Sequence, residues 1–159
     1  MSLQSPVGSD HQLARLLQIG VVLEEVVEAR AAKHAREGND LEPRVRAFLE
    51  EAAAESSNHR DRLEALIDDL HAESIPFEEV EQLVEARYEA ERDFDDVLYD
   101  QLCNEETAYK FYDDLLAAIE GSDASFGIDR ERLVTELESI RDEEAEGVEE
   151  VTALMEAEE

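Results

Sequence analysis

Residues 49–63 read LEEAAAESSNHRDRL, and this stretch is the most informative about the fold because it places polar residues on an apolar helix face. Around it the apolar side chains recur every three or four positions, which is the spacing of one face of an α-helix. These apolar positions are Val45, Phe48, Leu49, Ala52, Leu63, Leu66, Ile67 and Leu70. In the middle of that apolar face stand Glu55 and His59, four residues apart and therefore one above the other. A buried carboxylate is costly unless it is paired or binds a metal, so this helix predicts matching groups on other helices.

The acidic composition narrows the choice of partners. The 159 residues carry a formal net charge of −30, and Lys33 and Lys110 are the only lysines. Such a charge repels nucleic acid and anionic membranes, so we expect neither as a partner. The hydrophobic fraction of 43% and its regular spacing argue against an acidic disordered chain. An acidic, lysine-poor but well-patterned sequence resembles proteins of halophilic archaea, in which salt screens the repulsion and most carboxylates form a solvated surface.

The cysteine content and the apolar runs exclude further classes of protein. Cys103 is the only cysteine, so an internal disulfide is excluded, and without a CxxC motif a rubredoxin-type iron site or a zinc ribbon is excluded too. No apolar run approaches the ~20 residues of a membrane span, and no signal-peptide pattern begins the sequence. We therefore expect a cytoplasmic protein with a single domain over residues 1–159.

The periodicity predicts an all-α chain without strands. Helices are expected over about residues 9–37, 42–73, 91–120 and 129–156, with a crossover helical segment at 77–90. Short connections join the first helix to the second and the third to the fourth, whereas the longer one carries the crossover segment. This pattern predicts an antiparallel four-helix bundle made of two helical hairpins.

Four glutamates interrupt the apolar faces of the four helices. Glu24, Glu55, Glu105 and Glu144 each lie near the middle of a different helix, and His59 lies one turn from Glu55. Inward carboxylates with an imidazole are the ligands that a di-iron or di-manganese site requires. Because the chain has 44 acidic residues, one glutamate on one helix face is also expected by chance. Four at one level are harder to explain in that way.

These features resemble the ferritin-like superfamily, on the rubrerythrin side. The resemblance implies that Glu24 and Glu105 are the metal ligands of the first and third helices, and that Glu144, within RDEEAEGV at residues 141–148, is that of the fourth. It also implies that Tyr112 is the tyrosine that hydrogen-bonds beside such sites. The chain departs from the family pattern at two places. Gly147 stands where a ligating histidine is expected, and Ser56 stands three residues before His59, with Glu55 four before.

Two functions follow from the resemblance. The first is a protein that binds iron or manganese, as one ion or two. It would handle iron or reduce dioxygen or peroxide as an oxidase or peroxidase, with Fe(II) or an external electron donor. The alternative is a degenerate bundle without metal that acts as a structural or protein-interaction module, and Gly147 and Ser56 favour it. A third interpretation places the carboxylates in solvent. Inward polarity leaves a homodimer or higher homo-oligomer open.

Overall fold

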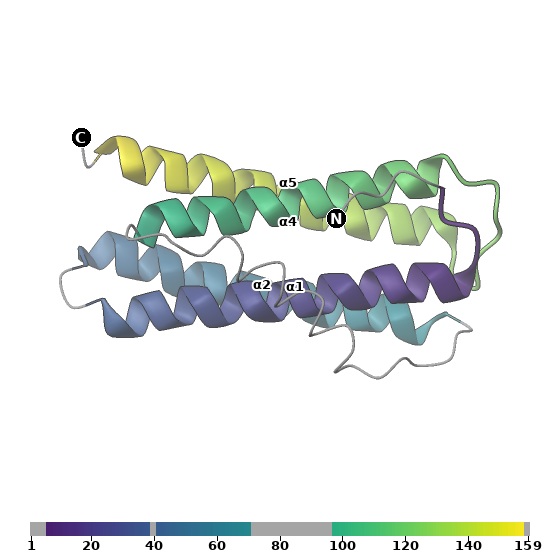
Figure 1. Cartoon of the computed structure of the whole chain (residues 1–159), viewed down its shortest axis with the longest axis horizontal. Helices are drawn as coiled ribbons and strands as arrows, with labels where there is room; N and C mark the ends of the chain where they lie inside the picture. Colours follow the sequence, from purple (N-terminus) through teal and green to yellow (C-terminus); the bar gives the residue numbers. More distant parts are fainter. Residues whose placement is uncertain (1–5, 39–40, 71–96, 158–159) are drawn as a thin grey trace.

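The computed structural model describes residues 6–38, 41–70 and 97–157, and the regular structure in these ranges is entirely helical. The helices are α1 (Asp10–Glu37), α2 (Pro43–Asp68), α4 (Val97–Glu120) and α5 (Arg130–Ala157), shown in Figure 1. Within these residues the predicted all-α class and the four long helices are confirmed. The second helix ends at Asp68 rather than near residue 73. The predicted crossover segment at 77–90 and the predicted start of the third helix lie outside the described residues.

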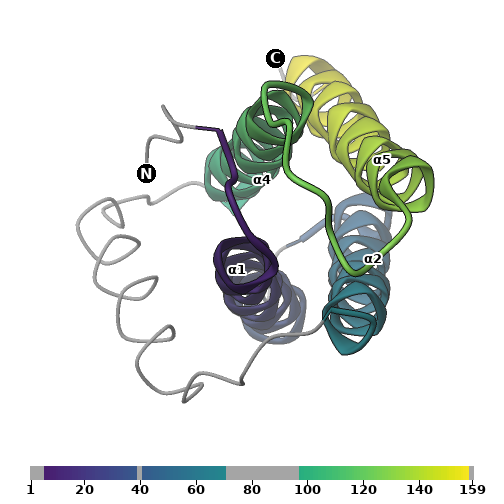
Figure 2. The same cartoon turned by 90° about the vertical axis from the view of Figure 1, so that its right-hand side faces the viewer.

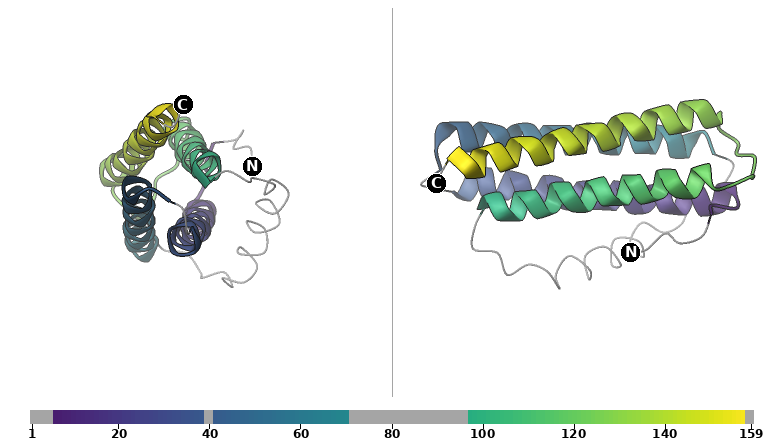
Figure 3. Two further views of the ribbon diagram at one scale, coloured as in Figure 1. Left: turned by 90° about the vertical axis from the view of Figure 1, so that its left-hand side faces the viewer. Right: turned by 90° about the horizontal axis from the view of Figure 1, so that it is seen from above.

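The four helices pack in two pairs. The most extensive contacts are between α1 and α2 and between α4 and α5, while α1 also contacts α4 and α2 contacts α5. Figure 1 shows that the two helices of each pair run in opposite directions. Seen along their axes, the helices stand at the four corners of a bundle (Figure 2; Figure 3, left). Each helix therefore turns one face towards the three others.

Local signals set the ends of α1. The Ser9 side chain accepts a hydrogen bond from the backbone N–H of Gln12 (3.2 Å), which satisfies one of the unpaired donors of the first turn. At the other end the N–H of Gly38 donates to the His34 carbonyl (3.0 Å) and closes the helix. The α4–α5 connection is fastened to this first turn, because the Asp10 carboxylate accepts from Gly127 N–H at 2.9 Å. The two hairpins are thus held together at this end of the bundle.

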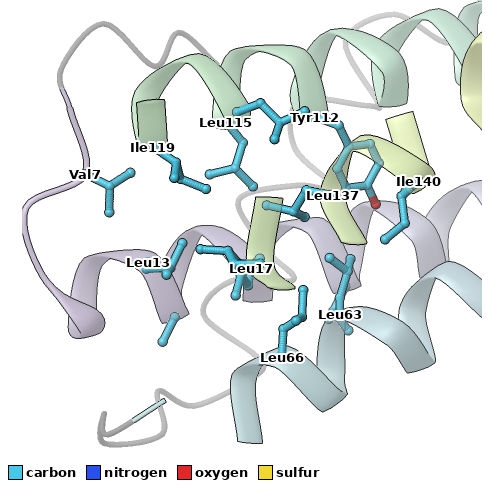
Figure 4. Packing of buried hydrophobic residues seen from close by; sticks show 14 of the residues in the cluster. Val7, Leu13, Leu17, Leu63, Leu66, Tyr112, Leu115, Ile119, Leu137 and Ile140 are labelled. Atoms are coloured by element: carbon cyan, nitrogen blue, oxygen red, sulfur yellow. The ribbon is translucent and has the colours of Figure 1, made fainter. Parts of the chain in front are cut away.

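The hydrophobic core is divided into two clusters. The larger one lies at the end where α1 begins, and Figure 4 shows side chains of all four helices meeting there. Its fully buried members include Leu13, Leu17, Leu63, Leu66, Leu115, Ile119, Leu133, Leu137 and Ile140. The smaller cluster lies at the opposite end and consists of Ala35, Val45, Phe48, Leu49, Leu98 and Val151.

A layer of buried polar side chains, to which all four helices contribute, lies between the two clusters. Its members are Glu24, Ser56, His59, Gln101, Asn104, Glu105 and Glu144. Dispersion and burial at both ends hold the helices in register, so the polar layer is enclosed rather than exposed. The interpretation that these carboxylates face solvent is therefore wrong for Glu24, Glu105 and Glu144.

Candidate metal centre

Three polar side chains from three helices meet at the centre of the polar layer. Glu24 of α1, His59 of α2 and Glu144 of α5 are each at most 3% exposed. His59 Nδ1 lies 3.0 Å from Glu144 Oε1 and 3.4 Å from Glu24 Oε1. One ligand atom from each residue lies within 4.8 Å of the others. We call these three residues the inner group.

Tyr112 of α4 orients the inner group from the fourth helix. Its hydroxyl donates a hydrogen bond of 2.7 Å to Glu24 Oε1, and the side chain is fully buried. Burial and the charges of Glu24 and Glu144 raise the pKa of Tyr112 well above its usual range. The hydroxyl therefore stays protonated and acts as a donor to Glu24. This is the position that the sequence analysis expected for Tyr112.

Glu105 of α4 borders the inner group because Gly147 leaves room for it. Its carboxylate accepts a hydrogen bond of 2.9 Å from the Gln101 side-chain amide. A Cβ atom at position 147 would lie 2.5 Å from Glu105 Oε2, far inside van der Waals contact. The space in which a histidine side chain at position 147 would begin is thus filled by the Glu105 carboxylate. The chain offers a carboxylate oxygen at the place where a histidine at position 147 would offer a nitrogen.

Glu55 lies elsewhere than the sequence analysis expected. The fully buried position on α2 belongs to Ser56, which is 5% exposed, whereas the Glu55 side chain is 35% exposed. Glu55 Oε1 approaches the far side of the His59 ring and lies 3.7 Å from Nε2. The structure therefore places Glu24, His59, Glu105 and Glu144 together and leaves Glu55 outside them.

Glu143 of α5 is a neighbour of His59 that the sequence did not predict. Its Oε1 lies 3.6 Å from His59 Nε2, close to the distance that Glu55 keeps from the same nitrogen. We call Glu55, Glu143 and His59 Nε2 the outer group. The spacing of Glu136 and Glu143, seven residues apart beside the inward face of α5, is the signal that could have indicated this position. Arg62 of α2 bonds both of these carboxylates.

The electrostatics of the inner group favour protons or a cation. Burial, together with the charges of Glu24 and Glu105, raises the pKa of Glu144 well above its ordinary value. Protonated Glu144 can then donate a hydrogen bond to Glu105, whose own pKa burial and the Glu24 charge also raise. Burial lowers the pKa of His59, but the hydrogen bond to Glu24 and the surrounding carboxylates raise it more, and the net direction is upward. The cluster therefore has more negative charge than its own side chains neutralise.

Several buried polar atoms in this layer lack a hydrogen-bond partner among the described residues. These atoms are Glu24 Oε2, His59 Nε2, Gln101 Oε1 and the side-chain nitrogen and oxygen of Asn104. An unpaired buried polar group costs about 1–3 kcal/mol, and more when it is charged. A cation bound between the carboxylates would give Glu24 Oε2 a partner. Two carboxylates and an imidazole suit divalent ions such as Fe(II), Mn(II) or Zn(II).

No helix in the described parts of the chain combines the length and the apolar character needed to cross a bilayer. Comparison with protein-family models, with curated proteins and with solved structures found no match to this chain.

Proposed function

We propose that this chain is a ferritin-like four-helix protein that binds a divalent transition metal, iron or manganese, between its helices. The observation that carries the proposal is the inner group, in which His59 Nδ1 lies within 3.4 Å of a carboxylate from each of two other helices. Fully buried carboxylates on facing helices are costly without a cation. The unpaired Glu24 Oε2 points to the same conclusion.

The order and direction of the helices support the ferritin-like assignment. In Figure 1 α2 and α4 run in the same direction, while each is antiparallel to its own hairpin partner. A bundle of two hairpins joined by one crossover connection has this relation between its second and third helices. The position of the carboxylates, one each from α1, α4 and α5, also agrees with sites built in the core of such bundles.

The chain's own residues would hold the ion and exclude water from it. Glu24, His59 Nδ1 and Glu144 would be its ligands, and Glu105 stands beside them as a further oxygen donor. Tyr112 fixes Glu24, and Gln101 fixes Glu105, through the hydrogen bonds described above. When bound, iron would supply the redox chemistry of an oxidase or peroxidase, with electrons from Fe(II) or an external donor.

A second function is a degenerate bundle that holds no metal and acts as a structural or interaction module. What favours it is that the pKa values of Glu105 and Glu144 are both raised by burial, so a proton held on one of these two acids would offset part of the negative charge. Protons rather than a cation would then neutralise the layer. The absence of a histidine at position 147 is consistent with this alternative.

A titration of chelator-treated protein with Mn(II) or with Fe(II) under anaerobic conditions separates the two functions. The wild type is expected to retain at least one ion per chain. His59→Ala and Glu144→Gln should each weaken binding by more than about 10-fold, because even outer-shell partners change metal affinity by about 10- to 100-fold. Glu138→Gln, an exposed position on the same helix as Glu144, is the matched control and should bind like the wild type. A wild type that retains neither metal would refute the proposal.

A further inference from the structure

The His59 ring presents its two nitrogens to two different groups of carboxylates. Nδ1 faces the inner group, at 3.0 Å from Glu144 and 3.4 Å from Glu24. Nε2 faces the outer group, at 3.7 Å from Glu55 and 3.6 Å from Glu143. The ring itself is fully buried, and Nε2 has no hydrogen-bond partner among the described residues. A buried imidazole nitrogen that lacks a hydrogen-bond partner among the described residues and faces two carboxylate oxygens suits a divalent cation.

The outer group connects this buried ring to the surface. The side chains of Glu55 and Glu143 are each 35% exposed, whereas the His59 side chain is 1% exposed. The two carboxylates come from α2 and α5, so the group lies where these helices meet. A cation arriving from solvent would meet it before reaching the inner group.

Glu143 is held in a position that leaves one oxygen available. Arg62 Nη1 donates to Glu143 Oε2 at 2.7 Å, and the Ser139 hydroxyl donates to the same oxygen at 3.3 Å. Oε1 is the oxygen that remains directed at His59. The positive charge of Arg62 is balanced because its Nε also bonds Glu136. The outer group therefore keeps a net negative charge in spite of the neighbouring arginine.

We propose that Glu55, Glu143 and His59 Nε2 form an outer divalent-cation site that loads the inner group. The loading role rests on the proposed function, because it requires a metal centre at the inner group. The outer site itself depends only on the positions of Glu55, Glu143 and His59 Nε2. Neither outer carboxylate belongs to the inner group, and the two sites share only the imidazole.

The chemistry of imidazole makes the two sites alternate. A neutral ring has one lone pair and one N–H, so only one of its nitrogens binds an ion at a time. With a cation in the outer site, Nε2 is the ligand and Nδ1–H donates to Glu144. With a cation in the inner site, Nδ1 would be the ligand and Nε2–H would face the Glu55 and Glu143 carboxylates. The ring carries one proton in both arrangements, so the transfer changes which nitrogen is protonated and not the number of protons.

Rapid mixing with Co(II), followed by its visible absorption, measures the loading step. Glu55→Gln with Glu143→Gln should slow Co(II) uptake at least 10-fold and leave the final inner occupancy within about twofold of the wild type. The control, Glu64→Gln with Glu138→Gln, removes the same charge from exposed positions of the same two helices and should change the rate less than twofold. Uptake at the wild-type rate by the outer double variant would overturn the loading role.

A second variant tests the outer site without the inner one. Glu24→Gln with Glu144→Gln should still bind one Co(II), at least 10-fold more weakly than the wild type binds its tightest ion. Adding Glu143→Gln should abolish that binding. If the inner double variant binds no Co(II), the outer site does not exist, whatever the wild type does. If instead the wild type's binding survives the inner substitutions unchanged and disappears with the outer ones, the outer site stands and the proposed inner metal centre fails.

Discussion

Gly147→Ala tests directly whether a missing side chain makes room for Glu105. In an isolated helix this change stabilises by about 1 kcal/mol, because glycine pays more backbone entropy than alanine. Here the new Cβ would lie 2.5 Å from Glu105 Oε2 and 2.6 Å from its Cδ. Carbon atoms in good contact lie about 3.5–4.0 Å from their neighbours, so the carboxylate would have to move by roughly 1 Å.

Moving the Glu105 carboxylate offsets the helical gain. The displacement breaks the 2.9 Å hydrogen bond from Gln101, which is worth about 1.5–3 kcal/mol when the acceptor is charged. We therefore expect Gly147→Ala to lower the free energy of unfolding by about 0.5–2 kcal/mol. In a Glu105→Ala background the same change should stabilise by about 1 kcal/mol, since nothing then opposes the Cβ.

Urea unfolding of the four proteins of this double-mutant cycle gives the coupling energy between positions 105 and 147. The expected coupling is at least about 1 kcal/mol, which exceeds the usual error of additivity of about 0.3–0.5 kcal/mol. Equal stabilisation of about 1 kcal/mol by Gly147→Ala in both backgrounds would refute the packing argument. The Glu105 carboxylate would then lie away from Gly147. The absence of a side chain at position 147 would no longer explain why Glu105 lies beside the inner group.

Three further changes test the polar layer and its surroundings. The pKa of Glu55 is raised by burial and neighbouring carboxylates from 4.5 to about 7, and those of Glu105, Glu144 and His59 are also raised, so the folded state binds more protons than the unfolded state over this window. The free energy of unfolding of the metal-free protein should therefore fall as the pH rises from 5 to 8. Urea titrations at several pH values measure this dependence. The double variant Glu105→Gln with Glu144→Gln should show a weaker dependence on pH. Tyr112→Phe removes the 2.7 Å hydrogen bond to buried Glu24 and should cost about 1.5–3 kcal/mol in chemical unfolding, while an unchanged midpoint would contradict this role. Among the described residues, Arg30→Met leaves His34, at 2.7 Å, as the side-chain partner of buried Asp100, and it should cost about 2 kcal/mol. Most of that loss should return when Asp100→Leu is added, because no buried charge then lacks a partner.

The helices and the level of the carboxylates follow from the sequence because both depend on local periodicity. The predicted bounds of 9–37 and 129–156 agree with α1 and α5 to within a residue or two. Apolar residues at both ends of each helix fix which face is buried, so the periodicity alone suffices to place Glu24, Glu105 and Glu144 inside the bundle.

The prediction was less accurate within single turns of α2. Successive residues on a helix differ by about 100° in direction, so Glu55 and Ser56 cannot both face the core. The buried positions 52, 56, 59 and 63 follow the helical spacing closely, and Ser56 belongs to them. Ser56 takes the buried position, while Glu55 lies at the edge of the same face, where it is 35% exposed and still approaches His59.

The buried polar residues of α4 could not be predicted from one helix alone. Asp100 is 2% exposed because Arg30 of α1 neutralises it and His34 of α1 contacts it, and these contacts depend on how the two helices meet. The position of Glu143 could not be predicted from α5 alone either, because its partners His59 and Arg62 lie on α2. Contacts between helices, rather than the periodicity of each, decide which carboxylates surround the imidazole.

Anomalous diffraction from crystals of the protein soaked in Mn(II) tests whether a metal ion binds between Glu24, His59 and Glu144. We predict an anomalous peak between Glu24, His59 Nδ1 and Glu144, at the distances of about 2.0–2.3 Å that oxygen and nitrogen ligands keep from such ions. A well-ordered structure with no peak there, or with peaks only at exposed surface carboxylates, would contradict metal binding by these residues and favour the metal-free bundle.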